Sequence, residues 1–326
     1  TSVVCHSLSD VPDIIDTWNE GKVADVEGYY ENAKINRVYV DRVHVKKAFA
    51  EYAAAYNADD PKIKLKIDHT YRVAALCERI AKAAGMCAYD VELAWLSGML
   101  HDVGRFEQIK RYNTFSDADS VDHAKFGADL LFKDGLISTF LKGMVKCTGY
   151  KPGALEDRYS SDGVFLYDRL NKSDMEMLEL AIRCHNMYRI PQGLNSREQA
   201  FCNVLRDADK VDIFKVNIDT PLEEIYNTTT EELMKSNITD EVLEAFDEEH
   251  CILKAIRRTP ADTVIGHVSL AYELVYDESV RITVEQGYLA KLMHFNSDNE
   301  ETNRKMAVVR EKMDSYVKKR IGEKDA

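Results

Sequence analysis

The sequence predicts an all-α fold, and three of its features carry that prediction. Apolar residues recur at spacings of three and four along most of the 326-residue chain, as they do on one face of a helix. Few runs alternate between apolar and polar residues with the period of a strand. Only six prolines occur, and they fall between the periodic segments, as Pro61, Pro191, Pro221 and Pro260 do. We therefore expect helices nearly throughout.

Two helices are expected between residues 42 and 85. The first covers 42–57, where apolar and aromatic residues follow at helical spacing: Val45, Phe49, Tyr52 and Tyr56. The second begins near Asp68, which would serve as its N-cap, and ends at Gly85 in the C′ position. His69 lies one turn before Val73 on the apolar face of this second helix, so it is expected to point inward.

Three more helices follow, and each carries a metal-binding residue type. The helix over 90–102 ends with His101 and Asp102, and Gly104 is expected to stop it. The next begins near Asp119 or Asp122 and presents His123. A helix over roughly 174–188 then presents His185 on its apolar face.

The chain from residue 196 onward also has helical periodicity. A helix opens with Ser196-Arg197-Glu198-Gln199, a capping-box pattern, and carries Asp209. A terminal helix is expected near 299–321, and no linker rich in Ser or Gly separates it from the rest. We expect an N-terminal extension at 1–40, a metal-binding core at 41–217 and a helical C-terminal extension at 218–326 packed on that core.

Composition excludes several classes of protein. With 43 basic and 56 acidic residues the net charge is -13, which argues against a general nucleic-acid binder. No stretch approaches 18 consecutive apolar residues, so no membrane span is expected. The N-terminus shows no basic region followed by an apolar run, and the seven cysteines form no C-x-x-C pair. These features favour a cytoplasmic protein with reduced cysteines; a homo-oligomer stays open.

The histidines and aspartates on these helices favour a metal site. A buried imidazole or carboxylate is costly unless it is paired or bound to a cation. Any one of the five elements, taken alone, is better explained as a hydrogen-bonded core residue or an ion pair. The set in its order, listed along the chain as His69, His101-Asp102, His123, His185 and Asp209, favours a divalent metal centre instead.

This order resembles the HD superfamily of metal-dependent phosphohydrolases. The resemblance covers about 145 residues and rests on five stretches: HTYRVAALCERIA (69–81), LSGMLHDVGRFEQ (96–108), DHAKFGADLLF (122–132), AIRCHN (181–186) and LRDADKVD (205–212). It implies an HD-domain helical bundle with the site in its middle, and hydrolysis of a phosphoester as the reaction.

By the same resemblance, His69, His101, Asp102 and Asp209 hold one metal ion. His123 and His185 match the extra histidines of members that bind two ions, so the resemblance implies a dinuclear centre in which Asp102 bridges and is catalytic. Ligands without thiolates favour Mn, Fe or a similar divalent ion over structural Zn. Asp209 follows an alanine, as the last ligand of the family usually does, although Asp207 and Asp212 are close alternatives.

Three basic residues near the ligands are candidates for binding substrate. Arg105 follows Asp102 by three residues, and its guanidinium could bind phosphate in two places at once, or pair with Glu107 or Glu78. Arg72 and Lys210 lie beside His69 and Asp209 and are weaker candidates, with a structural ion pair favoured for Arg72.

The sequence therefore predicts a phosphohydrolase that acts on a small phosphorylated substrate, nucleotide-like in character, through a dinuclear centre that activates water. Asn186 follows His185 where the cyclic-dinucleotide phosphodiesterases of this superfamily have a second histidine, so that subgroup is not favoured. Two alternatives stay open. One is a mixed-valent diiron oxygenase of the same fold with the same six ligands; the other is a non-catalytic sensor or interaction domain.

Overall fold

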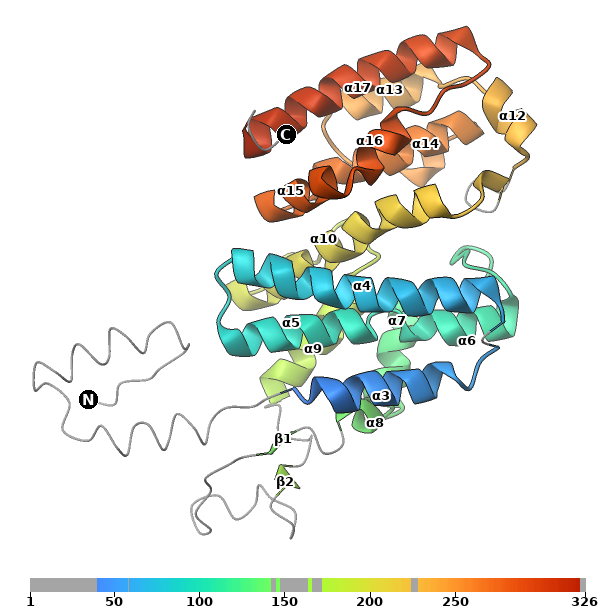
Figure 1. The fold of residues 1–326 in the computed structure, drawn as a ribbon. Helices are drawn as coiled ribbons and strands as arrows, with labels where there is room; N and C mark the ends of the chain where they lie inside the picture. The colour runs from blue at the N-terminus through green and yellow to red at the C-terminus, as the bar shows by residue number, and fades with distance from the viewer. Residues whose placement is uncertain are drawn as a thin grey trace, which may run out of the picture. The chain divides into compact units, whose positions relative to one another are not determined.

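The computed structural model describes residues 40–57, 59–141, 145–146, 164–165, 172–223 and 228–322 (Figure 1). Their regular structure is helical apart from a two-residue ladder, in which β1 (Val145–Lys146) pairs antiparallel with β2 (Val164–Phe165). The prediction of an all-α fold is confirmed. The expected N-terminal extension at 1–40 lies outside the described residues except for Val40.

The chain divides into two compact units, 1–205 and 206–326. The division falls inside α10 (Ser196–Asp219), a continuous helix that starts in the first unit and ends in the second. The predicted limits of the metal-binding core, 41–217, stay a prediction.

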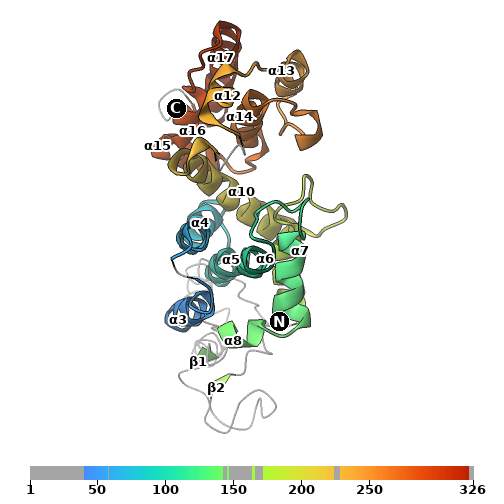
Figure 2. The ribbon, with the colours of Figure 1, turned by 90° about the vertical axis from the view of Figure 1, so that its right-hand side faces the viewer.

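In the first unit, α4 (Pro61–Ala83) and α5 (Ala88–Leu100) pack along one another (Figures 1 and 2). After α6 (Val103–Tyr112), α7 (His123–Ala128) packs on both α6 and α9 (Lys172–Cys184). The chain continues from α7 into a five-residue π-helix, η2 (Asp129–Lys133). The first described helix, α3 (Arg42–Ala53), packs on α8 (Ile137–Leu141).

An aromatic cluster holds α3 against α6. Phe49 and Phe106 are fully buried, with ring centroids 5.8 Å apart and planes nearly perpendicular. Tyr52 contacts the rings of Phe106 and Phe140 and donates a hydrogen bond to the carbonyl of Val103 at 3.0 Å. Burial of such a ring is worth about 1.5–3 kcal/mol, so the cluster fixes the start of α6 beside Asp102.

The start of α4 differs from the prediction. Asp60, not Asp68, is the N-cap; its carboxylate accepts a hydrogen bond from the amide of Lys62 at 2.9 Å, and Pro61 occupies the first helical position. Proline is tolerated there because its missing N–H would have no partner within the helix. Asp68 instead pairs with Lys64 on the exposed side of the helix. Gly85 does follow the helix end, with φ +72°.

The junction after Asp102 also differs from the prediction. Gly104 does not stop a helix; it lies in the first turn of α6. A Cβ atom at this position would lie 2.3 Å from the carbonyl oxygen of His123 and 2.7 Å from the amide nitrogen of Gly127. The glycine therefore allows α6 and α7 to approach closely, which brings His123 toward Asp102.

The N-cap of α10 is Asn195, one residue before the predicted capping box. Its side-chain oxygen accepts hydrogen bonds from the amides of Arg197 and Glu198 at 3.0 Å, and the Glu198 carboxylate accepts one from the amide of Asn195. The reciprocal pattern is that of a capping box, shifted by one residue because Asn is as good an N-cap as Ser.

The second unit continues from α10 through further short helices: α12 (Thr230–Lys235), α13 (Asp240–Asp247), η5 (Lys254–Ile256), α14 (Pro260–Val268), η6 (Ser269–Glu273), α15 (Asp277–Gln286) and α16 (Tyr288–Met293). The predicted terminal helix is confirmed as α17 (Glu300–Ile321), capped by Asn299. None of the helices in the described part of the chain combines the length and apolar character that a membrane crossing requires.

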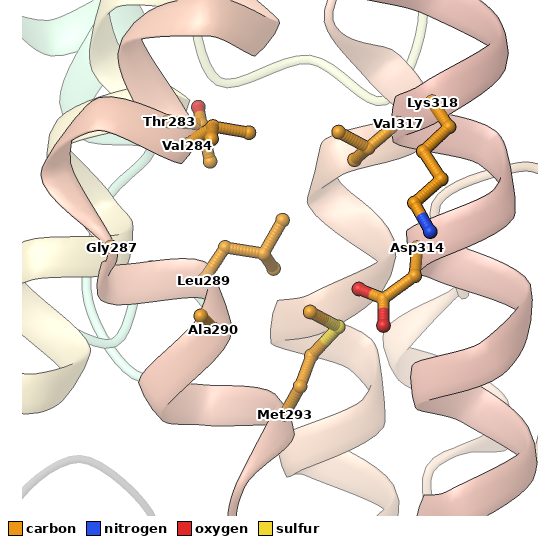
Figure 3. Close-up of a pocket in the computed structure, with 9 residues that line it drawn as sticks. All are labelled: Thr283, Val284, Gly287, Leu289, Ala290, Met293, Asp314, Val317 and Lys318. Atoms are coloured by element: carbon orange, nitrogen blue, oxygen red, sulfur yellow. The ribbon is translucent and has the colours of Figure 1, made fainter. Parts of the chain in front are cut away.

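A pocket of about 290 Å³ lies within the second unit between α15, α16 and α17 (Figure 3). Leu289, Met293 and Val317 give it an apolar lining, and the charged side chains of Asp314 and Lys318 extend from α17 beside it. No residue that the sequence predicts for the functional site lines this pocket.

Candidate metal centre

Five of the six predicted ligands come together in the first unit. These are His69, His101, Asp102, His123 and His185, whose exposed fractions are 0%, 0%, 2%, 4% and 4%. They come from four separate places in the fold: α4, the α5–α6 junction, the first residue of α7 and the residue after α9. The centre is therefore built by tertiary packing of helices that are distant in sequence.

The α5–α6 junction allows two neighbouring residues to reach one site. His101 caps the C-terminus of α5, and Asp102, with φ -107° and ψ 15°, precedes α6. The break in helical geometry brings the Nε2 atom of His101 and the Oδ2 atom of Asp102 within 3.5 Å of each other. His123 is positioned by its own N-cap: Asp122 accepts a hydrogen bond from the amide of Lys125, as predicted for a cap.

The carboxylate of Asp102 faces one pair of histidines with each oxygen. Oδ2 lies 3.5 Å from the Nε2 atoms of both His69 and His101. Oδ1 lies 3.5 Å from Nε2 of His123 and 3.8 Å from Nε2 of His185. We refer to these as the Oδ2 pair and the Oδ1 pair. A carboxylate between two sets of ligands is what a bridge between two cations requires.

Within each pair the Nε2 atoms face one another. They are 3.3 Å apart between His69 and His101, and 3.1 Å apart between His123 and His185. The Nδ1 atoms of His101 and His185 lie 2.7 Å from the carbonyls of Gly98 and Ile182, which can only accept. Nδ1 therefore carries the hydrogen in each ring, and Nε2 of the neutral ring presents a lone pair to the centre.

The protonation state of the centre suits a bound cation. Burial by itself raises the pKa of Asp102, but Lys66, His101, His123 and Arg105 together lower it well below its ordinary value. Burial also lowers the pKa of His123 to about 4, with Arg105 contributing, so this ring is neutral near pH 7. An ionised carboxylate beside a neutral imidazole is the protonation state that divalent metals bind.

Asp117 is a residue of the site that the sequence analysis missed. Its carboxylate accepts from Nδ1 of His123 at 2.7 Å, and the same carboxylate accepts from Arg105 and Gln108 at 2.9 and 3.0 Å. Burial raises the pKa of Asp117, but its hydrogen bond to His123 and the nearby positive charge of Arg105 outweigh that and lower it. It lies in the loop before α7, where no periodicity indicates which side chain turns inward.

Lys66 is the second residue that the sequence analysis missed. Its ammonium donates to Oδ2 of Asp102 at 2.7 Å, and its side chain is 11% exposed. It lies one turn before His69 on α4, so helical spacing places both on one face. The predicted start of α4 at Asp68 left Lys66 outside the helix, and this hid the relation.

Arg105 lies beside Asp102, as predicted, and its guanidinium has two differently used sides. Nη1 donates to Gln108, to the carbonyl of Phe115 and to Asp117. Nε is buried without a hydrogen-bond partner and lies 3.8 Å from Oδ1 of Asp102, which is also buried without one. The expected alternatives, pairs with Glu107 or Glu78, do not occur; Glu78 pairs with Arg42 and Lys82, and Glu107 with Lys110 and Arg111.

The remaining predicted residues lie on α4 and α10. Arg72 follows His69 by one turn on α4. Asp209 and Lys210 lie on the part of α10 that belongs to the second unit, and burial with the nearby charge of Arg206 lowers the pKa of Lys210. The roles of all three stay predictions.

Asp207, one of the alternatives for the last ligand, is hydrogen-bonded elsewhere. It is fully buried, and its carboxylate accepts hydrogen bonds from the amides of Val275 and Tyr276 and from the hydroxyl of Ser279, at 2.7 to 3.0 Å. These contacts satisfy two amides just before α15 and a hydroxyl in its first turn, so Asp207 holds the start of α15 within the second unit. Asp212 is also buried.

The residues of the centre fit a divalent cation. His101, Asp102 and His185 each offer a ligand atom, and these atoms lie within 4.8 Å of one another. Imidazole nitrogen and carboxylate oxygen suit Mn, Fe and related ions. The orphaned Oδ1 atom is the further sign, because a buried carboxylate oxygen without a partner is costly unless a cation compensates it.

Comparison with known proteins agrees with this geometry. No curated protein and no solved structure matches the chain. The family model of the HD domain matches residues 67–217, a span that contains all six predicted ligands. The fold that the resemblance implied, an all-α HD-domain bundle of the metal-dependent hydrolase type, is confirmed. Residues 67–217 of the chain therefore match the HD domain.

Proposed function

We propose that this protein is a phosphohydrolase that uses two divalent cations to hydrolyse a small phosphorylated, nucleotide-like substrate. The observation that carries the proposal is the division of the centre by Asp102. One oxygen faces His69 and His101, and the other faces His123 and His185. Separate histidine pairs on the two oxygens of one carboxylate favour two cations over one.

Asp209 is proposed as the sixth ligand, on the side of the Oδ2 pair. Two findings support it. The family match extends past Asp209 to residue 217, and the neighbouring Asp207 is engaged by the start of α15. Asp209 also lies about 200° around the helix from Asp207, so the two carboxylates serve different faces of α10.

Arg105 is proposed to bind the phosphate. Because Nη1 is already committed to three acceptors, the side of the guanidinium formed by Nε and Nη2 is the one available to an anion. Nε lies near Oδ1 of Asp102, so an anion there would lie beside a cation held by the Oδ1 pair. Arg72 and Lys210 are proposed as further contacts to the substrate.

The chemistry follows from this placement. Divalent cations held by the two pairs would supply Lewis acidity and lower the pKa of water for attack on phosphorus. The protein contributes the rest: Asp102 lies between both sides of the centre, and Nδ1 hydrogen bonds keep the rings of His101, His123 and His185 in their ligating tautomer. Burial strengthens the attraction between Arg105 and the phosphate charge that grows in the transition state.

Phosphate release from a panel of nucleotides and sugar phosphates, with Mn²⁺ and without oxygen, tests the proposal. Asp102→Asn should reduce the rate by at least about 100-fold, since it removes the charge between the pairs. Asp68→Asn, on the exposed side of α4, should leave it unchanged. Equal rates in Asp102→Asn and the wild type would reject the centre. Turnover that requires both iron and dioxygen would favour the oxygenase of the same fold.

A further inference from the structure

The Oδ2 atom of Asp102 already has a positive partner. The ammonium of Lys66 lies 2.7 Å from it, while the Nε2 atoms of His69 and His101 lie 3.5 Å from the same oxygen. A cation bound by the Oδ2 pair would use this oxygen as well. Lys66 therefore occupies one side of the atom that a metal ion must share.

Two positive charges at one buried oxygen repel each other strongly, because the low polarity of the interior screens them poorly. Before a cation binds, however, Asp102 needs a counterion, since removing one partner of a buried ion pair leaves an uncompensated charge. Lys66 meets that need in the protein as it stands. The same contact that stabilises the metal-free centre must oppose the entry of a metal ion.

The surroundings of Lys66 offer its ammonium a second position, beside Phe115 and Arg105. Its ammonium lies 5.5 Å from the centroid of the Phe115 ring, and the guanidinium of Arg105 lies 5.8 Å from the same centroid. Both cations also approach the Asp102 carboxylate, Lys66 at Oδ2 and Arg105 at Oδ1. An anion held by the Nε side of Arg105 would thus lie within reach of the Lys66 ammonium, because the lysine side chain is a flexible chain of four carbons.

We propose that Lys66 is an exchangeable counterion: it neutralises Asp102 before cations bind, yields Oδ2 to the cation, and then donates to the phosphate of the substrate. The second half rests on the proposed phosphohydrolase function. The first half rests only on the contact between Lys66 and Asp102 and on the fit of the centre to a divalent cation.

Calorimetric titration of the metal-free protein with Mn²⁺ tests the first half. Lys66→Met keeps the length and packing of the side chain but removes its charge, so it should bind Mn²⁺ about tenfold more tightly or better, a change of about 1.4 kcal/mol. Lys66→Arg keeps the charge and can pair with the carboxylate through two hydrogen bonds, so it should bind Mn²⁺ no more tightly than the wild type. Lys64→Met, on the exposed side of the same helix, is the matched control and should not change the affinity.

Titration of the Mn²⁺-loaded proteins with inorganic phosphate tests the second half. Lys66→Met should weaken phosphate binding by about tenfold, whereas Lys64→Met should not. If Lys66 has only a structural role, a folded Lys66→Met protein will bind Mn²⁺ with unchanged or lower affinity; either result overturns the proposal. If Lys66→Met does not fold, tighter Mn²⁺ binding by Lys66→Arg than by the wild type overturns it.

The two proposals fail in different ways. A wild-type protein that releases phosphate but shows equal Mn²⁺ affinity in Lys66→Met retains the proposed function and loses the exchange. A wild-type protein that binds no divalent cation overturns both.

Discussion

At the scale of the residue, the centre depends on which nitrogen of each histidine carries hydrogen. Backbone carbonyls fix this for His101 and His185, and a mutation cannot remove them. For His123 the partner is the side chain of Asp117, so the tautomer of this ring is open to experiment. A carboxylate only accepts, which places the hydrogen on Nδ1 and leaves Nε2 for the centre.

Asp117→Asn should therefore impair the Oδ1 pair. The amide can donate to Nδ1 and stabilise the wrong tautomer, and it also weakens the contact to Arg105. We expect metal affinity or phosphate release to fall by about 10–100-fold, the range seen when the outer partner of a ligating histidine is lost. A Mn²⁺ titration of phosphate release measures it. Asp119→Asn, exposed in the same loop, is the control; equal behaviour of the two variants would contradict the role of Asp117.

At the scale of the element, the centre requires α6 and α7 to cross closely. The crossing is between glycines: a Cβ atom at Gly104 would lie 2.3 Å from the carbonyl of His123, whereas one at Gly127 would come no nearer than 3.0 Å to the amide of Gly104. Gly104→Ala thus forces backbone atoms apart, while Gly127→Ala needs a shift of only a few tenths of an ångström.

We expect Gly104→Ala to lower the free energy of unfolding by about 1–3 kcal/mol, as overpacking of a tight contact does. Gly127→Ala should lower the free energy of unfolding by less. Because Gly104→Ala displaces His123, it should also weaken Mn²⁺ binding more than Gly127→Ala does. Urea unfolding, followed by circular dichroism, measures the stability of each variant, and Mn²⁺ titration measures its metal affinity. An equal or larger loss in Gly127→Ala would show that the crossing does not depend on Gly104.

The α14 helix of the second unit carries a histidine that predicts pH dependence. Burial lowers the pKa of His267 to about 3, and the charges of Arg257 and Lys254 add to the effect. The unfolded chain takes up a proton near pH 6.5, whereas the folded protein does not until about pH 3. The contribution of His267 to stability is therefore complete above pH 6.5 and is lost as the pH falls toward 3.

His267→Gln removes this titration while keeping a polar side chain. Between pH 6 and 4.5 the unfolding free energy of the wild type should fall more steeply than that of the variant, by up to about 1.4 kcal/mol per pH unit. Urea unfolding at several pH values measures both slopes. Parallel curves for the two proteins would mean that His267 is protonated to the same extent in the folded and unfolded states.

At the scale of the whole molecule, the sequence was informative where helices carry the site. Periodicity placed His69, His123 and His185 on inward faces, and all are buried beside Asp102. Sequence reasoning failed at the start of α4, where two residues are almost equally suitable as the N-cap. Asp60 and Asp68 are equally good caps, and only the tolerance of proline at the first position separates them.

The site residues that the sequence did not reveal have physical reasons for being missed. Lys66 was hidden by the misplaced start of α4. Asp117 lies in a loop, where side-chain direction follows from turns and not from a period. The boundary between the two compact units falls inside the continuous helix α10, where helical periodicity does not change.

The division of the centre into two histidine pairs predicts how many metal ions each chain binds. If each oxygen of Asp102 serves a separate cation, a loss in one pair should leave the other filled. Metal analysis after dialysis against Mn²⁺ should give two ions per chain for the wild type, one for His123→Gln, and fewer than one for Asp102→Asn.

Each bound ion also stabilises the folded state, by about 2.7 kcal/mol when its free concentration is 100 times the dissociation constant. Melting temperature should therefore fall in the same order, and a chelator should bring the wild type and His123→Gln closer together. One ion in both proteins would show that the Oδ1 pair binds no cation, and the orphaned oxygen of Asp102 would then need another partner.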